Sequence, residues 1–138
     1  MMLNTPFSVR SCLAAGLVLV LGGCAALGVD NRPADQIVAE RAQAWADALL
    51  VDDHEVAYEY TNPGYRQFAS PDKYHARVAG TSRWESAEVR EVTCEESACT
   101  VRMVVGYRGY KNTVDVVRSR EYRWVLSEGR WWLYVAAR

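Results

Sequence analysis

The chain has 138 residues, of which 16 are basic and 17 acidic, so its formal net charge is −1 at pH 7. A nearly neutral chain lacks the strongly basic face that binding to nucleic acid usually requires, so we expect no nucleic-acid partner. The length leaves room for one compact domain with one core behind an N-terminal leader, and not for two.

The N-terminal segment has the pattern of an export signal. Arg10 precedes an uncharged, mostly apolar run over residues 12–21, which is shorter than the ~20 residues of a membrane-spanning helix. The run ends in Leu21-Gly22-Gly23-Cys24, which resembles the lipobox of bacterial lipoproteins. The resemblance implies that residues 1–23 are a cleaved signal peptide and that Cys24 is the lipid-modified first residue of the mature protein. An ordinary secretory signal, cut nearby, is the alternative.

The lipobox resemblance also implies a place in the cell. Residues 24–33 would be the lipidated Cys and a short tether, whose stretch from Ala25 to Arg32 reaches at most ~28 Å when extended. Ala25 rather than Asp follows Cys24, which by Gram-negative sorting rules implies the periplasmic face of the outer membrane. In another kind of bacterium the anchor would lie in the cell membrane. With two or three acyl chains, the membrane is a stable partner.

The remaining cysteines of the mature chain predict one disulfide. With Cys24 acylated, Cys94 and Cys99 are left in an oxidising compartment, where disulfides persist. We expect them to bond across a hairpin whose loop is residues 95–98. Two cysteines with two distant histidines make no convincing zinc site, so we expect neither a metal nor another cofactor.

Helical patterns occupy the first half of the mature chain. Apolar residues at three- and four-residue spacing predict a long helix over residues 34–51. Two shorter helices are predicted over 54–60 and 71–79, and the second should end at Gly80 in the left-handed conformation. The segment Thr61-Asn62-Pro63-Gly64 between them predicts a turn.

From Trp84 onward the pattern has period two, which predicts antiparallel strands near residues 84–94, 98–108, 113–126 and 130–137. A Cys94–Cys99 bond implies a register for the first hairpin, with cross-strand pairs that suit one another. Its pairs are Thr93 with Thr100, Glu91 with Arg102, Val89 with Val104, Val92 with Val101 and Arg90 with Met103. The turn Glu128-Gly129 sets the register of the last hairpin. Its core-facing pairs are Leu126 with Trp131, Trp124 with Leu133 and Tyr122 with Val135.

The order of these elements resembles the nuclear transport factor 2-like superfamily, also called cystatin-like, to which SnoaL-like domains belong. The closing segment 121–135, EYRWVLSEGRWWLYV, is typical of its last hairpin. The resemblance implies an α+β domain over residues 34–138, in which three N-terminal helices pack on a curved antiparallel sheet of about four strands and form a cone. Such domains often hold an apolar pocket and dimerise through the sheet. They include isomerases, dehydratases and non-enzymatic proteins, so the fold leaves function open.

Aromatic side chains are frequent enough to line the opening of such a cone. The candidate pocket residues are Tyr60, Tyr65, Tyr74, Trp84 and Trp124. Their rings would hold an apolar ligand, and the Tyr hydroxyls would set its orientation. The alternative is that these rings fill the core.

Few residues suit acid–base chemistry. Asp72 and His75 lie three residues apart on one predicted helix, whereas His54 has no obvious partner. Because no set of nucleophile, base and orienting group can be assembled, we assign no catalytic residue and favour a protein that is not an enzyme.

A basic run follows the second predicted strand, and it fits phospholipid head groups, an acidic partner or a solvated strand edge. It consists of Arg108, Lys111, Arg118, Arg120 and Arg123.

One face of the last hairpin combines residue types that dominate binding energy at protein interfaces. These candidate interface residues are Arg123, Val125, Trp132 and Tyr134. Our first hypothesis is a non-catalytic envelope lipoprotein that acts as an accessory or interaction module through this sheet face, as a homodimer or with another envelope protein. The second hypothesis is a binder of a small hydrophobic ligand or, further off, an isomerase- or dehydratase-like enzyme that uses the cone pocket.

Overall fold

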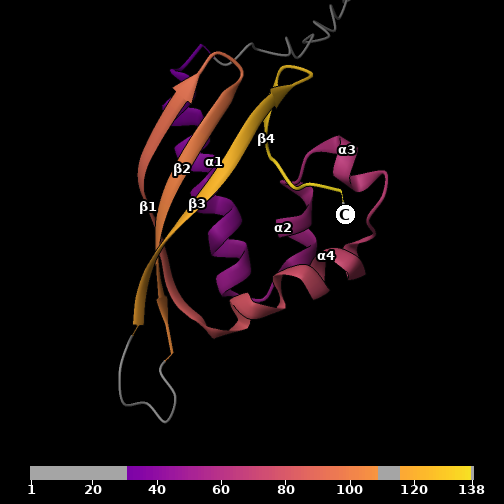
Figure 1. The fold of residues 1–138 in the computed structure, drawn as a ribbon, viewed down its shortest axis with the longest axis vertical. Coiled ribbons are helices and arrows are strands. Elements are labelled where there is room, and N and C mark those ends of the chain that lie inside the picture. The colour runs from indigo at the N-terminus through magenta and orange to yellow at the C-terminus, as the bar shows by residue number, and fades with distance from the viewer. Residues whose placement is uncertain (1–30, 109–115, 138) are drawn as a thin grey trace, which may run out of the picture.

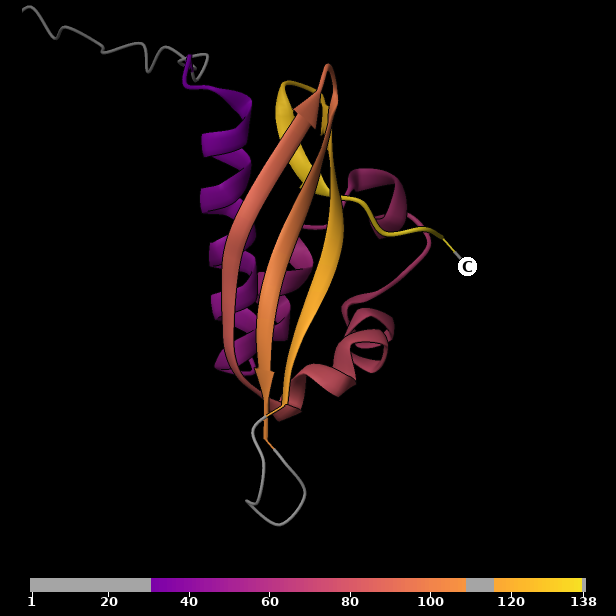
Figure 2. The ribbon, with the colours of Figure 1, turned by 60° about the vertical axis from the view of Figure 1, so that its left-hand side comes forward.

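The computed structural model describes residues 31–108 and 116–137 of the chain. The helices come first and the strands follow, and the helices lie on one side of the sheet (Figures 1 and 2). The described elements are α1 (Ala34–Leu50), α2 (His54–Glu59), α3 (Pro63–Arg66), α4 (Pro71–Val78), the 3-10 helix η1 (Ala79–Arg83), β1 (Trp84–Glu95), β2 (Ala98–Tyr107), β3 (Val116–Ser127) and β4 (Arg130–Leu133). The export signal and Cys24 lie outside the described residues, as does Lys111.

The helical part differs from the expected three helices. The described residues hold four α-helices and one 3-10 helix. The predicted turn at Pro63-Gly64 is the start of α3, because Pro63 has the backbone angle of a first helical residue and Asn62 accepts the N–H groups of Tyr65 and Arg66. Gly80 does not end a helix in the left-handed conformation. The chain tightens there into η1, where the Thr81 hydroxyl donates to the carbonyl of Val78 at 2.8 Å.

The sheet is antiparallel, in the order β1-β2-β3-β4. Near the β1–β2 turn the predicted register is confirmed, with Thr93 opposite Thr100. A β-bulge between Val89 and Glu91 then shifts the ladder, so that Val89 faces Met103. The predicted pairs Val89–Val104 and Arg90–Met103 are therefore wrong, because a bulge inserts an extra residue that period-two alternation cannot reveal. The remaining first-hairpin pairs, Glu91–Arg102 and Val92–Val101, are as predicted.

The last hairpin is shorter than predicted. Its pairs Leu126–Trp131 and Trp124–Leu133 form, but β4 ends at Leu133, and the predicted Tyr122–Val135 pair does not form in the ladder. After Leu133 the chain bonds instead to the loop after α2, where the side-chain oxygen of Asn62 accepts the N–H of Val135 at 2.8 Å. Among the described residues, the part of β3 before Arg123 consequently has only β2 as a ladder neighbour, and its other edge is open.

The core lies between α1 and the concave face of the sheet. Val38, Ala42 and Leu49 of α1 are buried against Val101 and Met103 of β2. The buried core cluster of the described residues runs from Val38 to Val135, so we expect the segment 31–138 to fold without the residues before it. None of the helices in the described ranges is long and apolar enough to cross a membrane.

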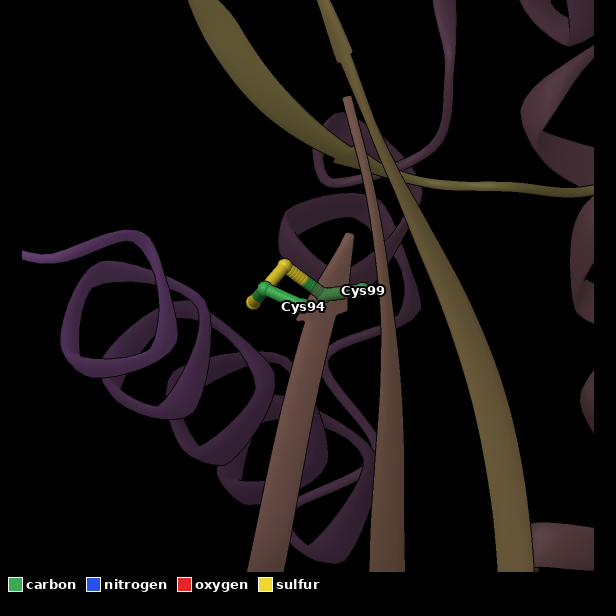
Figure 3. The surroundings of a disulfide bond; sticks show 2 residues. All are labelled: Cys94 and Cys99. Atoms are coloured by element: carbon green, nitrogen blue, oxygen red, sulfur yellow. A yellow bond between two sulfur atoms is a disulfide. The ribbon is translucent and has the colours of Figure 1, made fainter. Parts of the chain in front are cut away.

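The expected disulfide is present. Cys94 at the end of β1 bonds to Cys99 at the start of β2 (Figure 3). The bond closes the β1–β2 turn at the end of the sheet where α1 begins (Figure 1). Cys99 is buried in the core, so the bond ties the turn to the packed interior.

Candidate functional site

A cavity of about 410 Å³ lies between the sheet and the segment formed by α4 and η1. This site is at the end of the domain opposite the Cys94–Cys99 turn, where η1 leads into β1 (Figure 1). The open edge of β3 contributes one wall. The volume is within the ~300–1,000 Å³ typical of small-molecule sites.

Four aromatic rings from three strands and α1 line the cavity: Trp45, Trp84, Tyr107 and Tyr122. The Trp45 ring meets Trp84 edge-on at 6.3 Å and Tyr122 at 4.8 Å between ring centroids. These are the edge-to-face arrangements that aromatic pairs favour. The indole N–H of Trp45 donates to the hydroxyl of Tyr74 at 2.8 Å, which fixes the orientation of the Trp45 ring.

Burial keeps the hydroxyls of Tyr122 and Tyr74 protonated. Burial raises the pKa of Tyr122 to about 12, and the nearby Tyr107 adds to the shift. Burial likewise raises the pKa of Tyr74 to about 12, against a smaller opposite effect of the hydrogen bond from Trp45. At neutral pH, Tyr122 therefore presents a neutral phenol that can donate a hydrogen bond into the cavity.

Three arginines also line the cavity, and they come from three different elements: Arg77 of α4, Arg83 of η1 and Arg120 of β3. Arg120 donates from Nε to the Tyr107 hydroxyl at 3.1 Å, and this hydrogen bond raises the pKa of Arg120. Glu121 is the one acidic residue among the described lining residues. The site thus combines ring surfaces with an excess of positive charge.

The structure places the candidate pocket residues in two groups. Trp84 lines the cavity, whereas Tyr65, Tyr74 and Trp124 are buried in the core, with Trp124 fully inaccessible. Tyr60 is half-buried and lies edge-on to Trp124 at 6.4 Å. Tyr65 also borders a smaller hollow of about 280 Å³ beside α3 and α4.

Trp45 of α1 lines the cavity, although the sequence does not single it out. Periodicity alone places this residue on the apolar stripe of the helix and says nothing of a cavity. The place of Trp45 opposite Tyr122 depends on how α1 crosses the sheet, which no local pattern encodes.

Arg41 is a second residue that the sequence does not single out. It lies within the apolar stripe of α1, half-buried, and its Nε donates to the carbonyl of Trp131 at 2.8 Å. The guanidinium carbon lies 5.1 Å from the ring centroid of Tyr60 and 6.0 Å from that of Trp124. Burial lowers the pKa of Arg41, and the neighbouring Arg130 adds to this effect. Arg41 therefore bridges α1 and the last hairpin through cation–π contacts.

The candidate interface residues are not equally exposed. Tyr134 is 50% exposed and Arg123 is exposed, whereas Val125 is half-buried and Trp132 is only 7% exposed. The Trp132 ring is covered by the guanidinium groups of Arg66 and Arg130, each 4.8 Å from its centroid. The accessible part of this patch therefore consists mainly of Arg123 and Tyr134.

The two histidines lie together and do not line the cavity. The rings of His54 and His75 are 4.1 Å apart between centroids, and Nε2 of His54 is 3.9 Å from a carboxylate oxygen of Asp52. Asp72, which spacing relates to His75, occupies the first turn of α4, where a carboxylate stabilises the helix N-terminus. Within residues 31–108 and 116–137, no three His, Cys, Asp or Glu side chains are arranged to hold a metal ion.

No protein-family model matches this chain, and no curated protein sequence matches it. Solved structures do match. A SEC-C motif-containing protein from Rhodopseudomonas palustris superposes with a TM-score of 0.53 and 16% identity, over 69% of this chain and 73% of that one. A protein described as an NTF2-like transpeptidase from Campylobacter jejuni gives 0.53 and 14%, over 70% of this chain and 96% of that one.

A SEC-C motif-containing protein from Psychrobacter arcticus gives a TM-score of 0.58 and 10% identity, over 77% of this chain and 63% of that one. At these identities the likeness concerns the fold alone. The fold is thus α+β, with an open four-stranded antiparallel sheet similar to that of an NTF2-like protein.

Proposed function

We propose that the protein is a lipid-anchored, non-catalytic binding module of the bacterial envelope, which holds a small molecule with an apolar ring system in its cavity. The observation that carries this proposal is the ring-lined cavity of about 410 Å³ beside Trp45, Trp84 and Tyr122. Trp84 and Tyr122 are only half-buried, so their rings can contact a flat ligand, and the neutral phenol of Tyr122 is available to orient it.

The composition of the cavity favours binding over catalysis. Its described lining contains no histidine, and its single carboxylate belongs to Glu121. Alternation along β3 directs Glu121 to the sheet face opposite Tyr122, away from the rings. A general acid or base must reach the proton that it transfers, and these lining residues supply no such pair.

The position of the cavity fits a domain tethered through Cys24. Helix α1 has 17 residues and is therefore about 25 Å long. Its N-terminus follows the proposed tether, whereas the cavity lies toward its other end (Figure 1). A domain held in this way presents the cavity away from the membrane, toward solutes of the periplasm.

The test is a titration of the segment 31–138 with N-phenyl-1-naphthylamine, an uncharged probe that becomes fluorescent in apolar sites. We expect saturable binding at one site. Trp84→Ala should weaken it about tenfold, which corresponds to 1.4 kcal/mol of binding free energy. The matched control is Tyr134→Ala, which removes an exposed ring outside the cavity. No saturable binding, or equal weakening by both variants, would overturn the proposal. Urea unfolding of each variant establishes that it is folded.

A second candidate function is contact with another protein through the outer sheet face. Its support is the exposed ring of Tyr134 beside Arg123, to whose carbonyl the N–H of Tyr134 donates at 2.8 Å. Because Trp132 is buried, substituting it would disturb the fold, so Tyr134→Ser together with Val125→Ser is the sharper test. Sedimentation velocity should show a dimer of the wild type and a monomer of the double variant. A wild type that stays monomeric at high concentration contradicts self-association.

A further inference from the structure

The charge around the cavity is unbalanced in a specific way. Arg77, Arg83 and Arg120 converge on it from α4, η1 and β3. Glu121 is the one acidic residue of the described lining, and its cross-strand neighbour is Arg102, so the cavity keeps an excess of positive charge. The rings of the cavity therefore face a cluster of cations.

These arginines have no acidic partner among the residues that the structure describes. In the described ranges, none of the three forms a salt bridge, although other arginines of the domain form salt bridges with glutamates. Arg66 pairs with Glu59, Arg102 with Glu91 and Arg108 with Glu85. Three guanidinium groups that line one hollow, with no salt-bridge partner among the described residues, give it a positive potential that favours an anion.

Arg120 is also held in position. Its Nε donates to the hydroxyl of Tyr107 at 3.1 Å, and its guanidinium carbon lies 6.0 Å from the Tyr107 ring centroid. Toward the described part of the chain this is the one N–H of Arg120 that is engaged, and a guanidinium carries five. A guanidinium that is already oriented loses less conformational entropy when it binds an oxyanion in a bidentate manner.

We infer that the ligand of this cavity is an amphipathic anion, in which an apolar ring system packs against Trp45, Trp84 and Tyr122 and a carboxylate, sulfonate or phosphate group is bound by Arg77, Arg83 and Arg120. This inference rests on the proposed function and adds the chemical class of the ligand. The ring part supplies burial of apolar surface, and the anionic group supplies orientation and selectivity over neutral molecules.

A matched pair of probes separates the two contributions. N-phenyl-1-naphthylamine is neutral, and 8-anilino-1-naphthalenesulfonate carries the same ring system with one sulfonate. For the segment 31–138, the double variant Arg83→Gln/Arg120→Gln should lower the affinity for the sulfonate probe about tenfold and leave that for the neutral probe within about twofold. Raising the salt concentration should weaken binding of the sulfonate probe alone, because screening acts on the charged contact.

Arg123→Gln is the matched control, because Arg123 is an exposed arginine of the same strand that does not line the cavity. It should change the affinity for neither probe. The inference is overturned if the double variant leaves the sulfonate probe unaffected, or if Arg123→Gln weakens it equally. If the wild type does not bind the neutral probe at all, the proposed function itself fails. Failure of the inference is therefore distinguishable from failure of the proposed function. Arg120→Lys should bind the sulfonate probe more tightly than Arg120→Gln does, which would support a charge-dependent contact.

Discussion

Replacing Tyr74 by Phe removes a single oxygen atom from the support of the cavity. The Tyr74 side chain is 1% exposed, and its hydroxyl accepts the indole N–H of Trp45 at 2.8 Å. In Tyr74→Phe the Trp45 N–H loses its acceptor while it stays buried, because Trp45 is 3% exposed. An unsatisfied buried donor costs about 1–3 kcal/mol of unfolding free energy. For a domain of this size each kcal/mol lowers Tm by about 4–8 °C.

The same substitution has a second consequence, which depends on pH. Burial raises the pKa of Tyr74 to about 12, whereas an unfolded Tyr ionises near 10.0. Above pH 10 the folded state therefore keeps a proton that the unfolded state releases. The stabilising effect is complete below pH 10 and is lost as the pH rises from 10 through 12. At pH 11 the loss is about 1 kcal/mol. Phe cannot ionise, so this loss is absent from Tyr74→Phe.

Urea unfolding followed by far-UV circular dichroism at pH 8 and pH 11 measures both effects. Tyr74→Phe should be less stable than the wild type at pH 8, and the difference should shrink by about 1 kcal/mol at pH 11. Tyr122→Phe is the control. Its pKa is also raised to about 12 by burial, but no indole depends on its hydroxyl, so it should share only the alkaline effect. A difference that stays constant between the two pH values, or no loss at pH 8, would refute the reasoning.

Three further perturbations test other parts of the structure. Cys94→Ala/Cys99→Ala should lower the unfolding free energy by about 2 kcal/mol, and a reductant should have no further effect on this variant. Equal stability of the wild type and the variant would contradict the prediction. Arg41→Ala should lower the free energy of unfolding, measured by thermal denaturation, by about 2–3 kcal/mol, because it removes the hydrogen-bond donor to the Trp131 carbonyl and the cation beside the rings of Tyr60 and Trp124. Arg41→Lys should restore less than half of this stability. Cys24→Ser should abolish incorporation of labelled palmitate in cells. Cys12→Ser should not change it, because Cys12 begins the apolar run of the signal and no apolar segment precedes it. Labelling that survives Cys24→Ser would place the lipid elsewhere.

The sequence predicts much of this fold because the relevant signals are local. Spacing of apolar residues places α1, and the turn residues Glu128-Gly129 place the last hairpin, where both have positive φ. The pair Cys94–Cys99 predicts the register near its turn. The bulge after Val89 escapes prediction, since one extra residue leaves no trace in the alternation until the partner strand is known.

The cavity was harder to predict than the fold. Rings on different elements look alike in sequence, and packing decides that Trp124 fills the core while Trp84 borders a hollow. Trp132 was expected on an open face, but Arg66 of α3 covers its ring, and α3 itself is not predicted. Arg77, Arg83 and Arg120 lie up to 43 positions apart in the chain, so only the folded chain reveals them as one cluster. Long-range packing thus limits prediction of the site more than that of the elements.

The five tryptophans offer the most direct test of where a ligand binds. Trp45 and Trp84 line the cavity, whereas Trp131 and Trp132 do not. In a nitrogen–proton correlation spectrum of the ¹⁵N-labelled segment 31–138, each indole N–H gives a separate signal, which can be assigned by substitution. On titration with 8-anilino-1-naphthalenesulfonate, we predict that the Trp84 and Trp45 signals shift with saturation, while those of Trp131 and Trp132 stay in place. Shifts confined to Trp131 and Trp132, or no shift at saturating probe, would contradict a ligand site in this cavity.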